Sequence, residues 1–331
     1  MPSIGTHSGK FHCDEVLACS LLRCLSDFKN YEIIRSRNPV LLNKCDIVVD
    51  VGGEYDHLKR RYDHHQSSFN HSMKSLNLLD FNTKLSSAGL IYAHYGKKII
   101  EEICGLDQNP AIVEILYEKV YESFVEAVDA IDNGIAQFDG IPRYKLGGTL
   151  SDRVNRLNRS WNQIDYDENA KFLEAMNLVQ NEFCECLNYY YKTWLPARTV
   201  VKKSLENRFQ TDESGQIILL EMCVPWTEHF LELEKELSLD VHEITYIVYQ
   251  DPTSGQWRVQ SIPIDKKSAF KNRLPLAESW RGLRDAELSS VAGINGCVFV
   301  HMSGFIGGNE TRTGALDMAR KSLALAGKYK H

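Results

Sequence analysis

Short apolar runs alternate with longer stretches of helical periodicity along the first half of the chain. Strand patterns occur at residues 3–7, 31–35 and 46–51. Apolar side chains recur at helical spacing at residues 16–25, 86–104 and 109–133. The uninterrupted apolar run at 47–49 suits a strand that is buried on both faces. This order of strands and helices predicts an α/β domain with a mostly parallel sheet.

The pattern changes after a polar region at residues 134–165. A long helix is predicted from Glu168 to Asn188, or as far as Trp194, ahead of Pro196. Strand patterns then occur at 217–222, 244–250, 257–262 and 297–301, with helical patterns at 227–237 and 311–326. We therefore expect an α/β domain at 1–148, a helical connection at 149–204 and a second, mixed α/β domain at 205–331. The active site is expected in the cleft between the two α/β domains.

The composition limits the class of protein. Of the 331 residues, 43% are hydrophobic and 25% are charged, as in soluble globular proteins, and no stretch is biased enough to suggest a membrane span. The 38 basic and 44 acidic residues leave a net charge of −6, which argues against coating of nucleic acid through a general positive field. A nuclease is not excluded, because bound divalent cations would restore positive charge at a site.

The cysteines and the N-terminal segment bear on the compartment. The nine cysteines include no Cys-x-x-Cys pair, so most are expected to be buried, reduced thiols rather than zinc ligands. The residues before His7 contain no basic region followed by an apolar run, so no signal or transit peptide is expected. We expect an intracellular protein, in the cytoplasm or nucleus rather than in the mitochondrion.

Side chains able to bind metals follow the predicted elements at their carboxyl ends. They are His7 with His12 and Asp14, then Asp50, then Asp63, His64 and His65, and finally Asp129 and Asp132. The last two are three residues apart and share one helix face. Because ligands bind outside the carboxyl ends of parallel strands, these segments are expected to meet at one edge of the sheet.

The types of side chain indicate the metal. Imidazoles and carboxylates without thiolates suit manganese, magnesium or a similar divalent ion, with zinc or iron as alternatives. Four such segments could hold two ions about 3.5–4 Å apart, which would clamp the attacking and leaving oxygens of a phosphoryl displacement. Each residue alone also has a structural interpretation, since Asp14 and Glu15 would favour a helix N-terminus. Their order along the chain is what favours a site.

The order of "GTHSGKFHCDE", "VVDVGGEYD", "YDHHQ" and "AVDAIDNG" resembles the DHH phosphoesterase superfamily, named for its Asp-His-His motif. That superfamily includes exonucleases, oligonucleotide and cyclic-dinucleotide phosphodiesterases and an inorganic pyrophosphatase. Within it the chain is similar to the melanocyte proliferating gene 1 family over nearly its whole length, including "RVNRLN", "WRGLRDAEL" and "GCVFVHMSGFIGGNETRTGALDMA". The resemblance implies manganese-dependent 3′ to 5′ exonuclease action on single-stranded RNA or oligonucleotides, and hence a role in RNA processing.

The resemblance also implies roles for single residues. His7 and Asp14 match the first motif, Asp50 the bridging carboxylate, and His64 the metal ligand of the Asp-His-His motif that begins at Asp63. His65 would contact the scissile phosphate or protonate the leaving oxygen. The fourth motif offers Asp129 or Asp132, and the register of Asp-Asn-Gly favours Asp132.

One departure leaves the preferred ion open. The superfamily's first motif has two aspartates four and six residues after its histidine, where this chain has Phe11 and Cys13. His12 and Asp14 stand one residue later. In this chain one metal would therefore be bound by an imidazole where the superfamily has a carboxylate.

Two further segments are candidates for binding substrate. The glycine-rich stretch 304–314 is expected to be a turn whose backbone amides cradle a phosphate, with Gly307, Gly308, Asn309, Arg312 and the nearby His301. Arg153, Arg156 and Arg159 would form one basic ridge if residues 151–161 are helical. A tight connection and a solvated face are the structural alternatives for these two segments.

Three classes of function remain open. The first is a hydrolase, most directly an exonuclease acting through a water activated by two metals. The second is a small-molecule phosphoesterase acting on pyrophosphate or dinucleotides, which the dependence of turnover on chain length would separate from the first. The third is a non-catalytic regulatory protein that keeps its metal. Each of the three could be a homo-oligomer. A zinc deaminase is excluded, because no Cys-x-x-Cys follows "HCDE".

Overall fold

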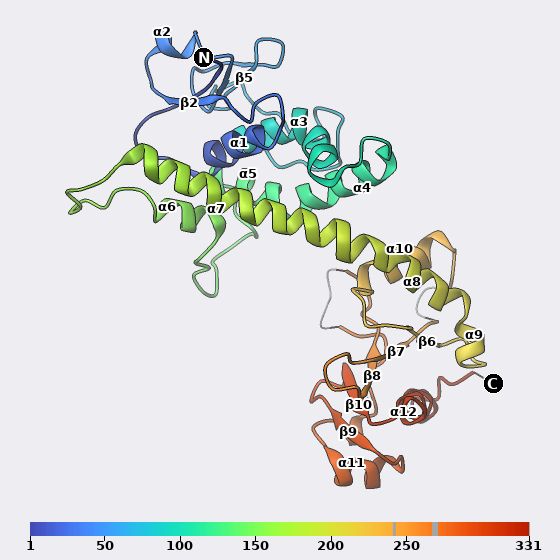
Figure 1. Ribbon diagram of the computed structural model, residues 1–331. Coiled ribbons are helices and arrows are strands. Elements are labelled where there is room, and N and C mark those ends of the chain that lie inside the picture. Colours follow the sequence, from blue (N-terminus) through green and yellow to red (C-terminus); the bar gives the residue numbers. More distant parts are fainter. Residues whose placement is uncertain (241–242, 267–270, 331) are drawn as a thin grey trace. The chain divides into compact units, whose positions relative to one another are not determined.

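The computed structural model describes residues 1–240, 243–266 and 271–330 (Figure 1). The chain divides into two compact units, Met1–Tyr191 and Lys192–His331. Each unit contains a five-stranded sheet with helices, so the predicted pair of α/β folds with a mostly parallel first sheet is confirmed. The three-part division at residues 148 and 204 stays a prediction.

The sheet of the first unit has the order β2 (Glu32–Arg35), β1 (Ser3–Thr6), β3 (Ile47–Val49), β5 (Arg61–Tyr62) and β4 (Tyr55–Asp56). The pairs β1–β2, β1–β3 and β3–β5 are parallel, and only the edge pair β4–β5 is antiparallel. The chain crosses from β1 to β2 on one side and then returns to β3 on the other. The carboxyl ends of β1 and β3 therefore flank a point where the strand order reverses, which is where ligands bind in open α/β sheets.

Helices cover this sheet unequally. Strand β3 points Ile47 and Val49 into the main core, with α1 (Cys13–Arg23) and α3 (Ser87–Cys104), while Val48 joins a small cluster at α2 (Pro39–Leu42) on the other face. The remaining helices of the unit are α4 (Pro110–Val120), a π-helical segment (Tyr121–Val125), α5 (Glu126–Asp132), α6 (Leu150–Asn155) and α7 (Glu168–Tyr189). Helix α7 packs along α1, as Figure 1 shows.

Two helix boundaries differ from those expected. The helical run of α7 does not end before Pro196 but continues through a π-helical segment, Tyr190–Trp194, into α8 (Leu195–Glu206). Pro196 is tolerated because the wide turn before it interrupts the regular hydrogen-bond ladder, so its missing N–H falls where a new helix begins. Helix α6 ends at Asn155, so the basic ridge predicted for a helix through residue 161 is wrong. Beyond it, the Asn158 side chain bonds the backbone N–H and C=O of Phe11 and holds the chain in a loop.

The second unit contains a mixed sheet in the order β6 (Ile217–Leu219), β7 (Tyr246–Gln250), β8 (Trp257–Ser261), β10 (Ile306–Asn309) and β9 (Cys297–Val300). Its other helices are α9 (Arg208–Thr211), α10 (Thr227–Glu236), a 3₁₀ turn (Glu278–Trp280), α11 (Asp285–Ala292) and α12 (Arg312–Leu325). Alternate strand residues face two separate cores, one with α11 and α12 and the other with α8 and α10. No helix in the described parts of the chain is long and apolar enough to cross a membrane.

Strand β10 corrects the expected glycine-rich turn. Gly307 and Gly308 pair with β8 on one side and with β9 on the other, so they form a central strand. A side chain at Gly307 would press on Leu276, Met318 and the backbone of Phe299. The glycines therefore allow close packing of this strand, and the turn-like cradle predicted for them is wrong.

Candidate metal centre

The segments selected from the sequence meet at the carboxyl edge of the first sheet. His7 follows β1, Asp50 follows β3, and Asp63 to His65 follow β5. Asp14 lies in the first turn of α1, and Asp132 is the last residue of α5. The structure thus brings five separate elements to one rim, as the strand-end positions predict.

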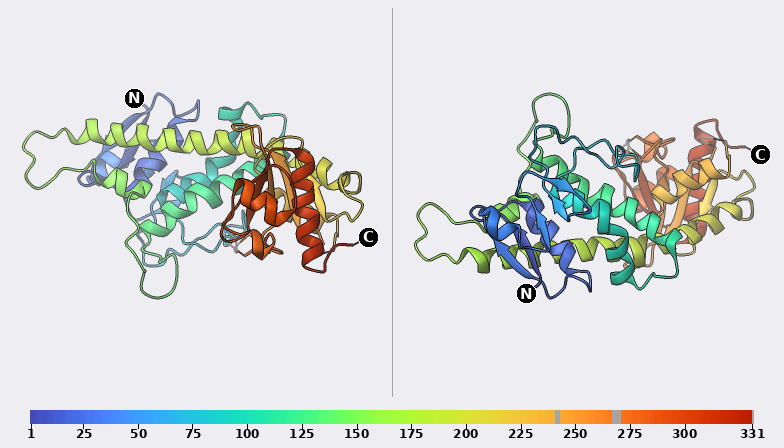
Figure 2. Two further views of the ribbon diagram at one scale, coloured as in Figure 1. Left: turned by 90° about the horizontal axis from the view of Figure 1, so that it is seen from below. Right: turned by 90° about the horizontal axis from the view of Figure 1, so that it is seen from above.

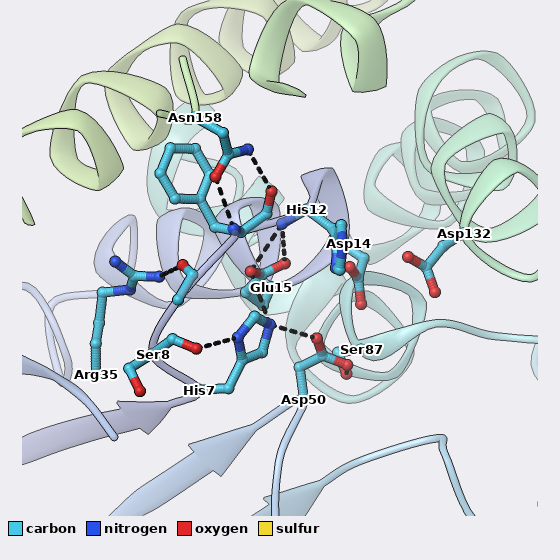
Figure 3. A network of polar contacts seen from close by, with 12 residues as sticks. His7, Ser8, His12, Asp14, Glu15, Arg35, Asp50, Ser87, Asp132 and Asn158 are labelled. Atoms are coloured by element: carbon cyan, nitrogen blue, oxygen red, sulfur yellow. Dashed lines mark hydrogen bonds and ion pairs between the residues drawn. The ribbon is translucent and has the colours of Figure 1, made fainter. Parts of the chain in front are cut away.

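Asp50 lies in the middle of this cluster, with His7 on one side (Figure 3). The Nε2 atom of His7 is 3.3 Å from Oδ2 of Asp50 and 3.0 Å from Oε1 of Glu15. All three side chains are buried. One imidazole nitrogen therefore faces two carboxylates from different elements.

His64 faces the other oxygen of Asp50. Its Nε2 atom is 3.3 Å from Oδ1 of Asp50 and 3.2 Å from Oδ2 of Asp132. The hydroxyl of Ser87 donates a 2.9 Å hydrogen bond to the same Oδ1 of Asp50. Asp50 itself has a φ of 58°, a left-handed conformation that Asp and Asn tolerate better than most residues.

Two of these side chains have buried atoms without hydrogen-bond partners. Both carboxylate oxygens of Asp14 and both ring nitrogens of His64 lack a hydrogen bond among the described residues. Asp14 is 0% exposed, and its nearest cationic candidate is Nε2 of His64 at 3.8 Å. Buried polar atoms are rarely left in this state. The unsatisfied atoms therefore point to a ligand that binds here, and a divalent cation fits nitrogen and carboxylate donors.

Three overlapping groups of side chains have donor atoms within 4.8 Å of one another. They are His7, His12, Glu15 and Asp50; Asp50, His64 and His65; and His12, Asp14 and Asp132. Asp50 and His12 each belong to two of the groups. None of the three groups, all drawn from the described residues, includes a cysteine, so the donors fit a hard or borderline ion better than a thiolate zinc site.

His65 is held at the edge of the cluster. Its Nδ1 atom lies 2.7 Å from Oδ1 of Asp63, whose other oxygen accepts the backbone N–H of Gly53. The hydrogen bond to Asp63 raises the pKa of His65 above its ordinary value, although partial burial opposes this. Because its side chain is 63% exposed, His65 can present its second nitrogen to a ligand in solution.

Asp129 and Asp132 have different surroundings. The carboxylate of Asp129 is completely buried and accepts hydrogen bonds from the backbone N–H groups of Ser86 and Gly89, the Ser86 hydroxyl and the Tyr121 hydroxyl. These donors occupy both of its oxygens, and Asp129 lies outside all three groups of candidate metal ligands. Burial raises the pKa of Asp129 to about 7, against the effect of these hydrogen bonds. Asp129 therefore fixes the start of α3, and we propose Asp132 as the metal ligand.

Substitution at these two positions should separate stability from metal binding. We expect Asp129→Ala to lower the free energy of unfolding by about 3 kcal/mol or more, because it leaves several buried donors unsatisfied. Asp132→Ala should cost the chelated protein less stability than Asp129→Ala, because it removes one contact with His64 instead of leaving several buried donors unsatisfied, but it should weaken manganese binding. Urea unfolding in chelator and manganese titration of both variants would check this. The opposite pairing of effects would show that Asp129 is the ligand.

The histidines of the metal-free centre should be protonated at neutral pH. Burial alone would lower the pKa of His7, but hydrogen bonds and charge from Asp50 and Glu15 raise it to about 10. For His64, Asp132 and Asp50 overcome the same effect of burial and raise the pKa to about 9. Burial raises the pKa of Asp14 as well, helped by the charges of Asp50 and Glu15.

Metal binding should therefore release protons. A ligating imidazole must be neutral and a ligating carboxyl group ionised, so we expect loading at pH 7.5 to release about two protons from His7 and His64, with Asp14 adding to that release. Affinity should rise with pH over the range below their pKa values. Calorimetric titration with manganese in two buffers of different ionisation enthalpy measures the release. An affinity that is independent of pH between 6 and 8 would contradict this protonation state.

The residue-level prediction missed three side chains near the centre. Glu15 faces His7 and also accepts the backbone N–H of His12, as a glutamate does at the third position of a helix. Arg37 and Gln66 line a cavity of about 520 Å³ together with His7, His12, Asp50 and His65. Arg37 follows the strand pattern at 31–35 by two residues, which is the signal that could have identified it.

The proposed substrate residues have different surroundings within their own units. Arg153 forms an ion pair with Glu182 on α7, whereas Arg156 is exposed in the loop after α6. In the second unit His301 and Arg312 are exposed. Asn309 is buried, and its side chain bonds the carbonyl of Asn295 and the N–H of Thr311, so it supports the start of α12.

Comparison with known proteins gives a family. The MYG1 exonuclease family model, described as an uncharacterised protein family (UPF0160), matches residues 3–323. The crystal structure of exonuclease RecJ bound to manganese is similar at 12% identity with a TM-score of 0.24, and the match covers 99% of this chain and 91% of that chain.

The curated relatives match over almost the whole chain. MYG1 exonuclease of Rattus norvegicus is 55% identical over 98% of this chain and 85% of its own length. MYG1 exonuclease of Homo sapiens is 54% identical over 98% of this chain and 86% of its own. A MYG1 protein of Caenorhabditis elegans is 51% identical over 97% and 95%, respectively. The resemblance inferred from the motifs is thereby confirmed, and the chain belongs to the MYG1 family.

Proposed function

We propose that this protein is a metal-dependent phosphodiester hydrolase that removes nucleotides from the 3′ end of single-stranded RNA or short oligonucleotides. The observation that carries the proposal is the position of Asp50 between His7 and His64, with each of its oxygens facing a different imidazole. The names of the mammalian relatives support an exonuclease. The choice of RNA and the direction of digestion come from the family resemblance.

The side chains divide into two sets around Asp50. One ion would be held by His7, His12, Glu15 and Asp50, and a second by Asp14, Asp50, His64 and Asp132. Two manganese ions are our proposal, with magnesium or another divalent ion as alternatives. Such ions supply Lewis acidity, which activates a water and offsets the negative charge that develops on phosphate oxygens.

The protein's own residues would position the phosphate and move a proton. Arg37 lines the cavity beside the centre and can donate to a non-bridging phosphate oxygen. Asp63 fixes the ring of His65 and favours its protonated form, so His65 can give a proton to the leaving oxygen. Ser87 holds Asp50 in place from α3.

The test is digestion of a 5′-labelled single-stranded RNA with manganese, magnesium or zinc, beside samples with chelator. We expect a ladder of products that shorten from the 3′ end, dependent on a divalent ion and absent in chelator. A 3′-labelled RNA should release labelled mononucleotide first. Turnover of pyrophosphate or dinucleotides without any digestion of RNA would replace this proposal with a small-molecule phosphoesterase. A metal-loaded protein that is inactive on all of these substrates would indicate a regulatory protein.

A further inference from the structure

A second polar cavity lies in the first unit and shares no lining residue with the cavity beside the metal centre. Its volume is about 540 Å³, within the range of sites that hold small organic ligands. It is lined by Gly9, Lys10, Asn155, Arg156, Asn158, Arg159, Ser160, Tyr166 and Glu168. Most of these residues belong to the loop between α6 and α7, which Figure 2 shows from two sides.

The charge of this cavity is positive. The side chains of Lys10 and Arg156 are exposed and form no hydrogen bond or ion pair within the described residues, while Arg159 donates only to the carbonyl of Gln163. The acid of the cavity, Glu168, is neutralised by Arg35, whose Nη1 lies 2.6 Å from Oε1 of Glu168. Three cations therefore face a polar space with no unpaired acid among its lining residues. In a chain of net charge −6, this arrangement favours an anionic ligand.

The wall of the cavity is rigidly held. The guanidinium of Arg35 stacks over the ring of Phe172 at 4.6 Å and donates through Nη2 to the carbonyl of Gly9. The side chain of Asn158 bonds both backbone groups of Phe11, at 2.9 and 2.8 Å. These contacts, visible in part in Figure 3, fix segment 8–11 against the loop after α6. The cavity is therefore formed without a ligand, which lowers the cost of binding.

Segment 8–11 also connects the cavity to the metal centre. Lys10 lies three residues after His7 and two before His12, both candidate metal ligands. Its Cα is therefore within about 7 Å of the Cα of His12, since two residues of extended chain span no more than that. A single-stranded nucleic acid whose terminal phosphodiester lies at the metal centre could place its next phosphate near Lys10.

From these observations we propose that the cavity of Lys10, Arg156, Arg159 and Tyr166 binds the nucleotide next to the scissile one in a single-stranded nucleic acid. This inference rests on the proposed exonuclease function and adds a subsite to it. The three cations bind the phosphate that neighbours the scissile one, and the half-buried ring of Tyr166, fixed by its hydroxyl on the carbonyl of Leu157, offers a surface on which a base stacks. Such a subsite makes the enzyme prefer strands over dinucleotides and pyrophosphate, which have no neighbouring nucleotide to bind.

The experiment compares wild type with the double variant Lys10→Ala/Arg156→Ala on a 12-nucleotide RNA and on the dinucleotide UpU. We expect the ratio of kcat/KM for the 12-mer to that for UpU to fall by at least about tenfold, the effect of losing one charge-assisted hydrogen bond. The slope of log kcat/KM against log salt concentration for the 12-mer should become less steep by up to about 0.7, because the contact with one phosphate of a single strand is lost. Lys97→Ala/Lys98→Ala is the charge-matched control, because both lysines lie on α3 and are paired with Glu114 and Asp27, which do not line the cavity.

The outcomes separate the subsite from the function it rests on. If the double variant keeps both the length preference and the salt slope of the wild type, the subsite is wrong and the exonuclease proposal stands. If Arg156→Glu also leaves the 12-mer unaffected, the cavity has no part in binding RNA. A wild-type protein that digests neither substrate in the presence of manganese would remove the exonuclease function and this subsite together. Melting curves of the variants, both altered at exposed side chains, show whether the fold is intact.

Discussion

Asp50→Asn is expected to abolish metal-dependent hydrolysis. The loss in kcat should be about 10³-fold or more, as when one member of a group of catalytic residues that act together is removed. The substitution removes the charge that faces both His7 and His64. Although burial would raise it, contacts with His64 and His7 hold the pKa of Asp50 below its ordinary range, so the native residue is a carboxylate. An amide would leave both proposed ions one anionic ligand short.

The fold should survive this change. Asn is, with Asp, among the residues that best tolerate the left-handed backbone of position 50. Its carbonyl oxygen can still accept the hydrogen bond from Ser87. A loss of activity without a large loss of stability would therefore show that the reaction needs the negative charge of Asp50, and that the fold does not.

The assay measures kcat on RNA, manganese binding and thermal unfolding for Asp50→Asn. Asp56→Asn is the control, because Asp56 lies on the edge strand of the same sheet, where its carboxylate contacts the local turn at Leu58 and Lys59. We expect wild-type kinetics from the control. If Asp50→Asn retains more than about a tenth of the wild-type kcat, Asp50 does not bridge the reacting centre.

The positions that sequence patterns predicted well are those whose chemistry depends on strand ends. His7, Asp50 and His64 each follow a short apolar strand, and parallel strands bring their carboxyl ends to one edge whatever the loops do. Asp132 and Asp129 could not be ranked by spacing alone. Their surroundings differ because Ser86 and Gly89, about 40 residues away in the sequence, donate hydrogen bonds to Asp129.

Where the prediction failed, tertiary contacts outweighed a local pattern. Arginines three residues apart suit a helix, yet α6 ends at Asn155 because the side chain of Asn158 is bonded to the backbone of Phe11. Strand β10 reads Ile-Gly-Gly-Asn, which has almost no strand signal. It forms because β8 and β9 leave a place between them that only a strand with little side-chain volume can fill.

Asp14→Asn is expected to stabilise the metal-free protein while removing much of its response to metal. The carboxylate of Asp14 is fully buried and accepts no hydrogen bond from any residue that the structure describes. Burial and the charges of Asp50, Glu15 and Asp132 raise its pKa, so folding without metal must either bury an uncompensated charge or take up a proton. Removing the ionisable group should raise the free energy of unfolding in chelator by about 2 kcal/mol. The lost attraction to the α1 N-terminus offsets about 0.5 kcal/mol of this gain.

The sign of the pH dependence follows from the same shift. When folding raises the pKa of a carboxyl group, the free energy of unfolding of the protein falls as pH rises. The fall occurs between the pKa of the group in the unfolded state, about 3.9, and its higher pKa in the folded state. The advantage of Asp14→Asn over wild type should therefore be larger at pH 8 than at pH 5.5. Urea unfolding in chelator at both values measures it, with Asp27→Asn as a control at an exposed carboxylate that is paired with Lys98.

The metal response completes the argument, because the same carboxylate should have opposite effects in the two states. Manganese stabilises any protein that binds it only when folded, by an amount that grows with affinity. Wild type should therefore gain melting temperature on adding manganese, and Asp14→Asn should gain much less because it lacks one of the buried donors. A variant that is less stable than wild type in chelator, or that keeps the full increase with manganese, would mean that Asp14 is a structural residue of α1 rather than a ligand that costs stability until metal binds.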